Sequence, residues 1–548
     1  MRKGRAEVDA VIVGAGFAGL YAHHRLRQLG LTLQGYEVAR DVGGTWWWNR
    51  YPGARCDVES MDYCYSFSPE LEQEWTWSER YATQPEILRY IDHVADRFDL
   101  RRDIQFETRV TAAAWDDLAQ RWHVMTERGD TVSAQFCVMA VGCLSAAKRP
   151  EVDGIDAFRG PTFHTGQWPH EGVDFAGLRV GVIGTGSSGI QSIPLIAEQA
   201  AHVTVFQRTP NFTMPAKNAP LDPGAVNARK THYREHRQAM RESRAGVVVP
   251  MPEESALDVD ADARRAKFDA AWESGTLYGM VSAYNDLLVN RDANNTAAEF
   301  ARSRIQDIVK DADVAERLSP RNHPFGTKRP CLDSGYYSTY NRDDVTLVDV
   351  RSTPIVEITP KGIRTSTEEY VLDAIVFATG FDAMTGPLLG PEITGVDGVA
   401  LRDKWAAGPR TYLGIMTAGF PNLFAVTGPG SPSVLVNMLV AIEQHVDWVA
   451  ECIAYLRDRD LGSIDATVEA EDAWVDHVNA VAGHTLFPTA DSWYMGANVP
   501  GKPRVFMPYI GGFPRYTEIC DGVAADGYRG FVLTPKTASR REHSASST

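Results

Sequence analysis

Two glycine triplets in this chain have the spacing of dinucleotide-binding loops. The first, Gly14-x-Gly16-x-x-Gly19, directly follows the apolar run Asp9–Val13, and the second, Gly184-x-Gly186-x-x-Gly189, directly follows Arg179–Ile183. In such loops the glycines allow a tight turn and a close approach to a pyrophosphate, whose charge is met by the N–H groups of the following helix. One triplet alone is weak evidence, but here each one follows a predicted strand and opens a predicted helix.

The position 23 residues after the first glycine differs in charge between the two units. In the first unit it is Glu37, whose carboxylate can accept hydrogen bonds from ribose hydroxyls. This triplet does not identify its nucleotide, because FAD and NAD sites share the pattern. In the second unit it is Gln207, followed by Arg208. A carboxylate would repel a ribose 2′-phosphate, whereas an amide beside an arginine can accept one, so we expect NADP(H) here rather than NAD(H).

Two further stretches combine charge with glycine and proline. Residues Gly43–Ser60 are unusually aromatic and also contain Arg50, Arg55 and Asp57. Aromatic side chains could simply fill a core beneath this loop, but a core does not need the charges, so we predict a structured loop against a flat ligand. The loop Pro324–Pro330 contains the adjacent cations Lys328 and Arg329. Such a pair is, by itself, typical of a solvated turn.

The segment between the two glycine units carries a further pattern. Its residues Phe158-x-Gly160-x-x-x-His164-x-x-x-Trp168-Pro169 resemble the signature of the type I Baeyer–Villiger monooxygenases. The similarity extends over nearly the whole chain and is greatest to the phenylacetone and steroid monooxygenase branch. The resemblance implies an enzyme that binds FAD and NADP(H). It would use NADPH and O2 to oxidise ketones to esters or lactones through a C4a-peroxyflavin, with sulfoxidation as a side activity.

The resemblance also implies roles for individual residues. Arg329 matches the arginine that stabilises the peroxyflavin and Asp57 matches the acid beside it, so we expect both to be catalytic. Lys328 matches a lysine that contacts the coenzyme. The expected substrate pocket contains Leu435, Met438 and Trp493. The expected cofactor-binding residues are Gly14, Gly16, Phe17, Gly19, Glu37, Gly44, Thr45, Trp46, Trp47, Asp57, Tyr63, Thr185, Gly186, Ser187, Ser188, Gln191, Arg208, Thr209, Lys328, Arg329 and Trp493.

The linker residues His164 and Trp168 are expected to couple the two domains rather than to carry the chemistry. A histidine in such a linker is more often a structural hydrogen-bonding residue than a catalyst, and the resemblance agrees with that interpretation. Cys143 stands where close relatives carry other residues, so its contacts are not predicted.

Alternating and helical patterns predict the elements that position these residues. Strand Thr32–Glu37 follows the first nucleotide helix, which ends near Leu29, and the second nucleotide helix ends near Gln199. A helix over 85–98 and strands over 104–110, 122–126 and 136–140 complete the first half. Strands are also predicted over 374–377 and 423–426. A helix with apolar positions from Leu435 to Ile453 follows the loop Gly428–Ser433, and we expect its positive end to face the flavin.

The sequence therefore predicts an α/β fold with two Rossmann-like dinucleotide-binding domains, for FAD and NADP, and a helical insertion in the NADP domain. The first part of the FAD domain is expected over 1–145, and the NADP domain over 146–383 with its insertion at about 220–320. The second part of the FAD domain is expected over 384–533, followed by a disordered tail over 534–548. The flavin domain is thus expected to be discontinuous.

Composition excludes several classes of function. The net charge of −16 argues against nucleic acid or an anionic membrane as the partner. No apolar run approaches the ~18 residues of a membrane span. Seven cysteines without a Cys-x-x-Cys motif fit a reducing cytoplasm and provide neither a zinc cluster nor the redox pair of a disulfide reductase. We predict no metal site.

Two alternatives share the nucleotide sites. A flavin monooxygenase acting on amines or sulfides would have the same fold, although the linker and Arg329 favour ketone oxidation. A flavin-dependent redox sensor would need no substrate pocket, and NADPH oxidation with and without a ketone distinguishes it. We expect a cytoplasmic monomer or weak homo-oligomer that acts on a ketone and O2.

Overall fold

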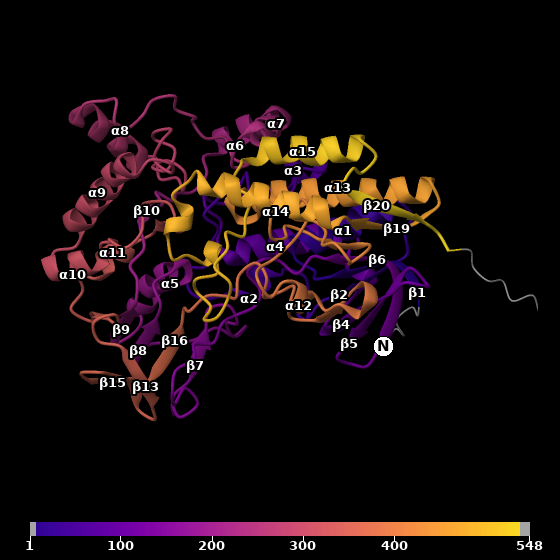
Figure 1. Cartoon of the computed structure of the whole chain (residues 1–548). Helices are drawn as coiled ribbons and strands as arrows, with labels where there is room; N and C mark the ends of the chain where they lie inside the picture. The colour runs from indigo at the N-terminus through magenta and orange to yellow at the C-terminus, as the bar shows by residue number, and fades with distance from the viewer. Residues whose placement is uncertain (1–6, 538–548) are drawn as a thin grey trace, which may run out of the picture.

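The computed structural model describes residues 7–537, and most of its strands form two large sheets that lie side by side (Figure 1), while the others form three small sheets. The strands are β1 (Glu7–Val13), β2 (Leu33–Tyr36), β3 (Ile104–Gln105), β4 (Val110–Asp116), β5 (Arg121–Thr126), β6 (Thr131–Met139), β7 (Thr162–His164), β8 (Arg179–Ile183), β9 (His202–Gln207), β10 (Thr213–Pro215), β11 (Cys331–Asp333), β12 (Val345–Asp349), β13 (Ile355–Thr359), β14 (Gly362–Thr365), β15 (Glu369–Val371), β16 (Ala374–Phe377), β17 (Glu392–Thr394), β18 (Leu423–Ala425), β19 (Leu461–Ala466) and β20 (Phe531–Pro535). The α-helices are α1 (Phe17–Gln28), α2 (Thr45–Trp48), α3 (Pro69–Glu74), α4 (Gln84–Arg97), α5 (Ser187–Ala197), α6 (Pro223–Thr231), α7 (Tyr233–Glu242), α8 (Ala261–Glu273), α9 (Arg291–Ile308), α10 (Ala312–Leu318), α11 (Tyr336–Thr339), α12 (Leu401–Lys404), α13 (Met438–Asp458), α14 (Val468–Gly483) and α15 (Phe513–Ala525).

The first sheet has the order β17-β4-β5-β6-β1-β2-β3, with β18 also paired to β6. β1 is parallel to β2 and β6, whereas β4, β5 and β6 form an antiparallel meander. The side chains of Val8, Ala10, Val11 and Ile12 in β1 are buried, as expected for a parallel strand covered on both faces. Because β17 and β18 come from the last third of the chain, this sheet is discontinuous in sequence.

The second sheet has the order β12-β9-β8-β16-β7, and all its strands are parallel. β8 and β16 have the predicted bounds. β7 belongs to the segment that joins the two glycine units, so the linker is partly a strand, held beside β16 by backbone pairing. Both large sheets contain parallel strands, and in each one a glycine loop follows a strand and precedes a helix. This arrangement confirms the predicted α/β fold class.

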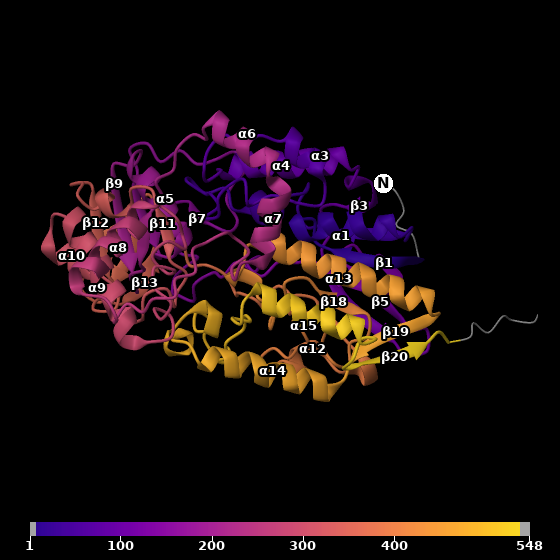
Figure 2. The same cartoon turned by 90° about the horizontal axis from the view of Figure 1, so that it is seen from above.

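The C-terminal helices return to the first sheet. α13 lies along α1 (Figures 1 and 2), where Arg25 of α1 forms an ion pair with Asp447 at 2.6 Å. The apolar stripe of α13 is buried at Leu439, Ile442, Val446, Val449 and Ile453, as its periodicity predicts.

Four of the five α-helices between residues 220 and 320 fall into two groups. α6 and α7 lie near α3 in both views (Figures 1 and 2), and Arg237 of α7 donates to Glu72 of α3 at 2.8 Å. α8 and α9 instead contribute Phe268, Trp272 and Phe300 to a separate apolar cluster that also includes Phe212. The insertion is helical as predicted, but part of it packs on the first sheet's side. The domain boundaries remain a prediction.

Three local predictions were wrong. The strand predicted over 104–110 is divided between β3 and β4, because the backbone at Glu107 adopts a positive φ of 51° and turns the chain. The stretch Thr45–Trp48 within the predicted loop forms the short helix α2. Thr534 and Pro535, assigned to the disordered tail, belong to β20, where they pair with Ser463 and Leu461 of β19. The rest of that predicted tail, from residue 538 onward, lies outside the described residues.

The predicted helix after Gly428–Ser433 is also interrupted. A 3-10 turn, η3 (Ser433–Leu435), is followed by extended backbone at Val436, and α13 begins only at Met438. The Asn437 side chain caps α13 by accepting from the Leu439 N–H at 3.1 Å. One N–H group in the first turn of α13 therefore has a protein partner, and the orientation of this turn toward the flavin remains a prediction.

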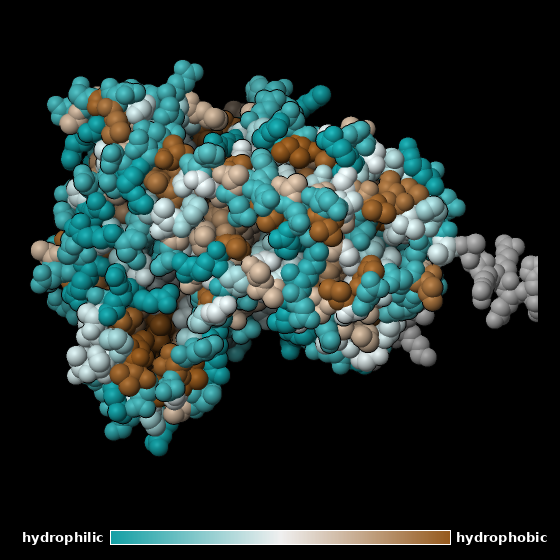
Figure 3. Space-filling view, viewed as in Figure 1, coloured by the Kyte–Doolittle hydropathy of each residue, from teal (hydrophilic) through white to brown (hydrophobic). Residues whose placement is uncertain are grey.

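The surface is mostly hydrophilic on the face seen in Figure 3, with separate hydrophobic patches. Within residues 7–537 no helix combines the length and the apolar character needed to cross a membrane. The same residues contain no group of three or more potential metal ligands.

Candidate active site

The first glycine loop is packed too closely for side chains. Gly14 has a φ of 105°, and a Cβ there would overlap the carbonyl oxygen of Ala140. A Cβ at Gly19 would overlap the Gly14 carbonyl oxygen, and one at Gly16 would lie 3.3 Å from the Cα of Gly44. α1 begins after Gly16 with no side-chain cap and no acid in its first turn. Its N–H groups are thus available to an anionic group.

Glu37 is buried at the end of β2 beside this loop. Its carboxylate accepts from the Ala15 N–H at 2.7 Å and from the Ala39 N–H at 2.8 Å. Burial raises the pKa of this carboxyl, and the backbone hydrogen bonds oppose that shift. The carboxylate therefore fixes the loop backbone, while its predicted contact with a ribose remains a prediction.

Aromatic residues predicted to bind a cofactor gather next to the first loop. The buried rings of Phe17 and Trp46 lie 5.5 and 6.0 Å, edge to face, from the ring of Tyr63. The indole N–H of Trp46 points to the Tyr63 hydroxyl at 3.3 Å. Trp47 turns the other way, toward His170 of the linker, at 4.5 Å between ring centroids, and Thr45 is exposed. This loop thus has one aromatic side near α1 and another near the linker.

The second glycine loop is as crowded as the first at Gly184 and Gly189 but is open at its middle glycine. A Cβ at Gly186 would have no protein atom within 4 Å, and α5 starts there without a side-chain cap. Nothing in the protein itself requires a glycine at this position, which is the arrangement expected if a ligand fills the space. The neighbouring hydroxyls have partners, because Thr185 donates to the Thr209 carbonyl at 3.0 Å and Ser188 lies 3.0 Å from the Thr165 hydroxyl. Ser187 lies 3.1 Å from the Cys331 sulfur.

Cations gather beside the second loop. Burial, and next the charge of Arg208, lower the pKa of Lys328 to about 8. Burial and Arg208 also lower the pKa of Lys148, a residue that the sequence did not single out because it lies in no motif. Within residues 7–537 neither Arg208 nor Lys328 has a carboxylate within 4.0 Å. Uncompensated positive charge of this kind suits a phosphate group.

Gln207, at the end of β9, is buried and donates to the Arg317 carbonyl at 2.8 Å. Its side-chain oxygen has no hydrogen-bond partner within the described protein. Here the neutral amide replaces the carboxylate found at Glu37, as the argument for a 2′-phosphate requires.

Arg329 connects the two halves of the site. Its Nε lies 3.8 Å from Oδ2 of Asp57, and its Nη1 donates to the Val434 carbonyl at 3.3 Å. The Arg329 side chain is 26% exposed and that of Asp57 is 7% exposed. Burial lowers the pKa of the guanidinium, but Asp57 and the neighbouring Tyr494 outweigh it and the net shift is upward. Arg329 therefore stays charged while largely shielded from water.

Gln191 of α5 holds the loop that carries Asp57. Its amide N–H groups reach Asp57 Oδ1 at 3.4 Å and the Arg55 carbonyl at 3.2 Å, and its oxygen accepts from the Tyr51 hydroxyl at 2.8 Å. The sequence suggested a cofactor contact for Gln191; that role remains a prediction, and the observed one is to tie the two glycine units together.

An apolar cluster lies beside Arg329. The predicted substrate residues are among its partly buried members: Leu435, Met438 and Trp493. Its buried members include Cys143, Met384, Phe487, Tyr494 and Phe506. The contacts of Cys143, which the sequence did not predict, are with this apolar cluster. Burial raises the pKa of its thiol to about 11. The three predicted residues are thus brought together, which spacing alone could not establish.

The linker residues His164 and Trp168 contact segments on both sides of the linker. His164 lies in β7, where Nδ1 accepts from the Gly166 N–H at 3.0 Å and Nε2 lies 3.1 Å from the Lys148 carbonyl. The buried Trp168 donates its backbone N–H to the Trp48 carbonyl at 3.3 Å. These contacts fit the predicted coupling role, and neither side chain reaches Arg329 by a hydrogen bond.

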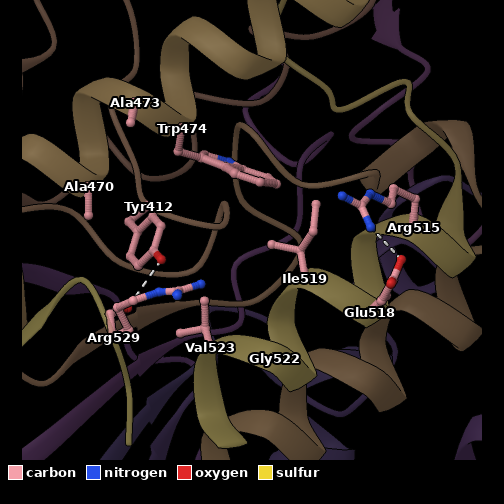
Figure 4. Close-up of a pocket in the computed structure, with 10 residues that line it drawn as sticks. All are labelled: Tyr412, Ala470, Ala473, Trp474, Arg515, Glu518, Ile519, Gly522, Val523 and Arg529. Atoms are coloured by element: carbon pink, nitrogen blue, oxygen red, sulfur yellow. Dashed lines mark hydrogen bonds and ion pairs between the residues drawn. The ribbon is translucent and has the colours of Figure 1, made fainter. Parts of the chain in front are cut away.

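A hollow of about 360 Å³ lies elsewhere, between α14 and α15 (Figure 4). Trp474, Ile519 and Val523 line it, and the Arg515–Glu518 ion pair of 2.5 Å stands at its side. None of the predicted site residues borders this hollow, so we do not associate it with the site.

Comparison with known proteins agrees with this geometry. A model of the pyridine nucleotide-disulphide oxidoreductase family matches residues 11–261. The chain is 44% identical over 530 residues to a Baeyer–Villiger monooxygenase of Pseudooceanicola batsensis, covering 96% of each chain. It is 39% identical over 532 residues to a phenazine N-monooxygenase of Lysobacter antibioticus, covering 96% of this chain and 97% of that one. The solved structure of an oxidised steroid monooxygenase bound to NADP is 55% identical, with a TM-score of 0.92, covering 96% of this chain and 99% of the other.

Proposed function

Because the chain belongs to the Baeyer–Villiger monooxygenase family, we propose that it oxidises ketones to esters or lactones, with bound FAD and with NADPH as the reductant. The observation that carries this function is the position of Arg329. It stands next to Asp57 and beside an apolar cluster, in a protein with two glycine loops suited to dinucleotides.

The residues present fit both cofactors. FAD would be held by the first loop, where Gly14 and Gly19 leave no room for side chains and the uncapped start of α1 can meet its pyrophosphate. NADP(H) would be held by the second loop, with the open space at Gly186 for its pyrophosphate and Arg208 and Lys328 for its 2′-phosphate. Bound FAD, once reduced by NADPH, supplies the activation of O2.

The protein's own contribution is electrostatic and steric. Arg329 is a permanently charged donor, and in a site with little water its charge stabilises the negative charge that develops during oxygen transfer. Asp57 and the Val434 carbonyl orient its guanidinium. Leu435, Met438 and Trp493 provide apolar surface for the ketone and help to exclude water.

The test is a panel of ketones with FAD-loaded protein. We expect NADPH consumption to rise with an accepted ketone and the product to have the mass of the ketone plus one oxygen atom. Cyclohexanone, phenylacetone and a steroid ketone cover a range of sizes. If FAD-loaded protein consumes NADPH yet forms only hydrogen peroxide with every ketone, the proposal is wrong and the redox-sensor alternative gains support.

Oxygenation at sulfur or nitrogen is a second candidate activity, favoured by the 39% identity to a phenazine N-monooxygenase. Methyl phenyl sulfide and phenazine belong in the same panel. We expect sulfoxide at a lower rate than ester. A rate on phenazine above that on every ketone would make nitrogen oxygenation the main function. A cytoplasmic monomer or weak homo-oligomer remains our proposal for its state in the cell.

A further inference from the structure

The loop Thr427–Ser433 joins β18 to the turn η3, and its backbone is strained at both ends. Thr427 has a φ of 55° and Ser433 a φ of 43°, values that residues with side chains rarely adopt. Both residues are buried. A strained conformation persists only where surrounding contacts over-determine it, so the partners of these two residues decide the shape of the loop.

The partner of Thr427 is His445 of α13. Nδ1 of His445 accepts from the Thr427 backbone N–H at 3.0 Å, and Nε2 lies 2.7 Å from the Tyr516 hydroxyl. That hydroxyl donates to the carbonyl of Leu413 at 2.5 Å. Leu413 also has a positive φ, of 58°. His445 and Tyr516 are fully buried.

The contacts of His445 and Tyr516 determine which of their atoms carry the protons. Burial lowers the pKa of His445 to about 3, so the ring is neutral and has one donor and one acceptor. Since Nδ1 accepts, Nε2 carries the proton and donates to the Tyr516 oxygen, which leaves the Tyr516 proton for Leu413. Every polar atom of this buried chain is thus satisfied.

The series of hydrogen bonds continues from Thr427 to Arg329. The Ser433 hydroxyl donates to the Thr427 carbonyl at 3.1 Å, and the next residue, Val434, accepts from Arg329 Nη1 at 3.3 Å. A shift of the Thr427 backbone would therefore move the carbonyl that orients the guanidinium.

We propose that His445 is a positioning residue for Arg329, acting through Thr427, Ser433 and Val434, an inference that rests on the proposed function. It touches no reacting atom. It holds the strained loop in the one conformation that presents the Val434 carbonyl to the guanidinium.

The test compares two isosteric substitutions. In His445→Asn the amide oxygen takes the place of Nδ1 and keeps the bond to Thr427. In His445→Gln the amide NH2 group takes the place of Nε2 and keeps the bond to Tyr516, but the bond to Thr427 is lost. Both remove part of a buried ring, so a merely structural role predicts similar losses from both. If His445 positions Arg329, the ratio of ester to hydrogen peroxide falls about 10-fold or more in His445→Gln and much less in His445→Asn.

A second readout does not depend on activity. Hydrogen–deuterium exchange of the segment 427–437 in the FAD-loaded protein should speed up in His445→Gln and stay near wild type in His445→Asn. Trp448→Phe is the matched control, because it removes another buried bond between α13 and α15, from Trp448 to the Cys520 carbonyl at 3.1 Å, without touching Thr427.

The possible results distinguish the role of His445 from the proposed oxidation of ketones. Equal product ratios and equal exchange in the Asn and Gln variants overturn the role of His445, even if wild type makes ester. Absence of ester from wild type overturns the proposed function, while the exchange comparison still decides whether His445 holds the loop. If neither His445 variant folds, Ser433→Ala tests the inference, because it removes the hydrogen bond from Ser433 to the Thr427 carbonyl. A product ratio and an exchange rate like those of Trp448→Phe would then overturn the inference.

Discussion

The Nε atom of Arg329 lies 3.8 Å from Oδ2 of Asp57, although the two residues come from loops that are far apart in the sequence. The separation is that of an ion pair rather than a hydrogen bond. Asp57 thus limits the movement of the guanidinium without taking a hydrogen bond from it, and Nη1 donates to the Val434 carbonyl.

Arg329→Ala should fold and bind FAD but form no ester, because the positive charge that stabilises oxygen transfer is gone. Remaining NADPH oxidation should appear as hydrogen peroxide, and Arg329→Lys should recover little, since an ammonium lacks the planar fork. Asp57→Asn should lower ester formation less, by about 10-fold, because the arginine remains but is less well oriented. Product mass and peroxide are measured together. Ester at a near wild-type rate in Arg329→Ala would refute the assigned role.

Arg208→Ala should raise KM for NADPH by about 10-fold or more, the effect of losing one charge-assisted contact. KM for NADH should barely change, because NADH has no 2′-phosphate. Arg342→Ala is the control: this arginine pairs with Asp344 at 2.8 Å and has no predicted coenzyme contact. Equal losses with both coenzymes would show that Arg208 does not recognise the 2′-phosphate.

Lys328 should make NADPH binding dependent on pH. Its pKa in the free protein is lowered to about 8, so its positive charge is present below that pH and is lost as the pH rises through it. A bound phosphate favours the charged form, so KM for NADPH should rise above about pH 8. Lys328→Met should have a higher KM throughout and lack this step. An unchanged pH profile in Lys328→Met would contradict the prediction.

Gly186→Val should fold and retain FAD but lose NADPH binding, since the first added atom meets only open space in the protein and the larger side chain would occupy the place of a pyrophosphate. Gly16→Val should show the reverse, with FAD lost. FAD absorbance and NADPH titration of the two variants provide reciprocal controls. Normal FAD content in a folded Gly16→Val protein would remove the assignment of the first site.

The loop that carries Trp493 should depend on one ion pair. Nζ of Lys502 lies 2.5 Å from Asp382 Oδ1 and 2.7 Å from the Ala383 carbonyl. Lys502→Met should make this loop more sensitive to limited proteolysis and raise KM for the ketone, and the charge-exchanged double variant Lys502→Asp, Asp382→Lys should recover part of both. Arg504→Ala, which removes the exposed pair with Asp491 on the same loop, is the control. Identical digestion of the Lys502→Met and Arg504→Ala proteins would refute the anchor.

The local elements around the nucleotide loops were predictable because short-range patterns determine them. β8 and β16 have the predicted bounds, and α1 and α5 end within one or two residues of expectation. Errors occurred where a single backbone angle or a distant partner intervened. The positive φ of Glu107 split one predicted strand, and pairing with β19 turned the start of the predicted tail into β20.

By itself, the sequence determined the two dinucleotide units, the preference for a 2′-phosphate and, through the linker signature, the family, since these depend on residue types at fixed spacings. The proximity of Arg329 to Asp57, the grouping of Leu435, Met438 and Trp493, the use of Gln191 to hold the Asp57 loop and the burial of His445 were decided by the tertiary structure. Each of these joins segments that are remote along the chain, and local propensity carries no information about which remote partners meet; only the packing of the two sheets and their helices brings those side chains within contact distance.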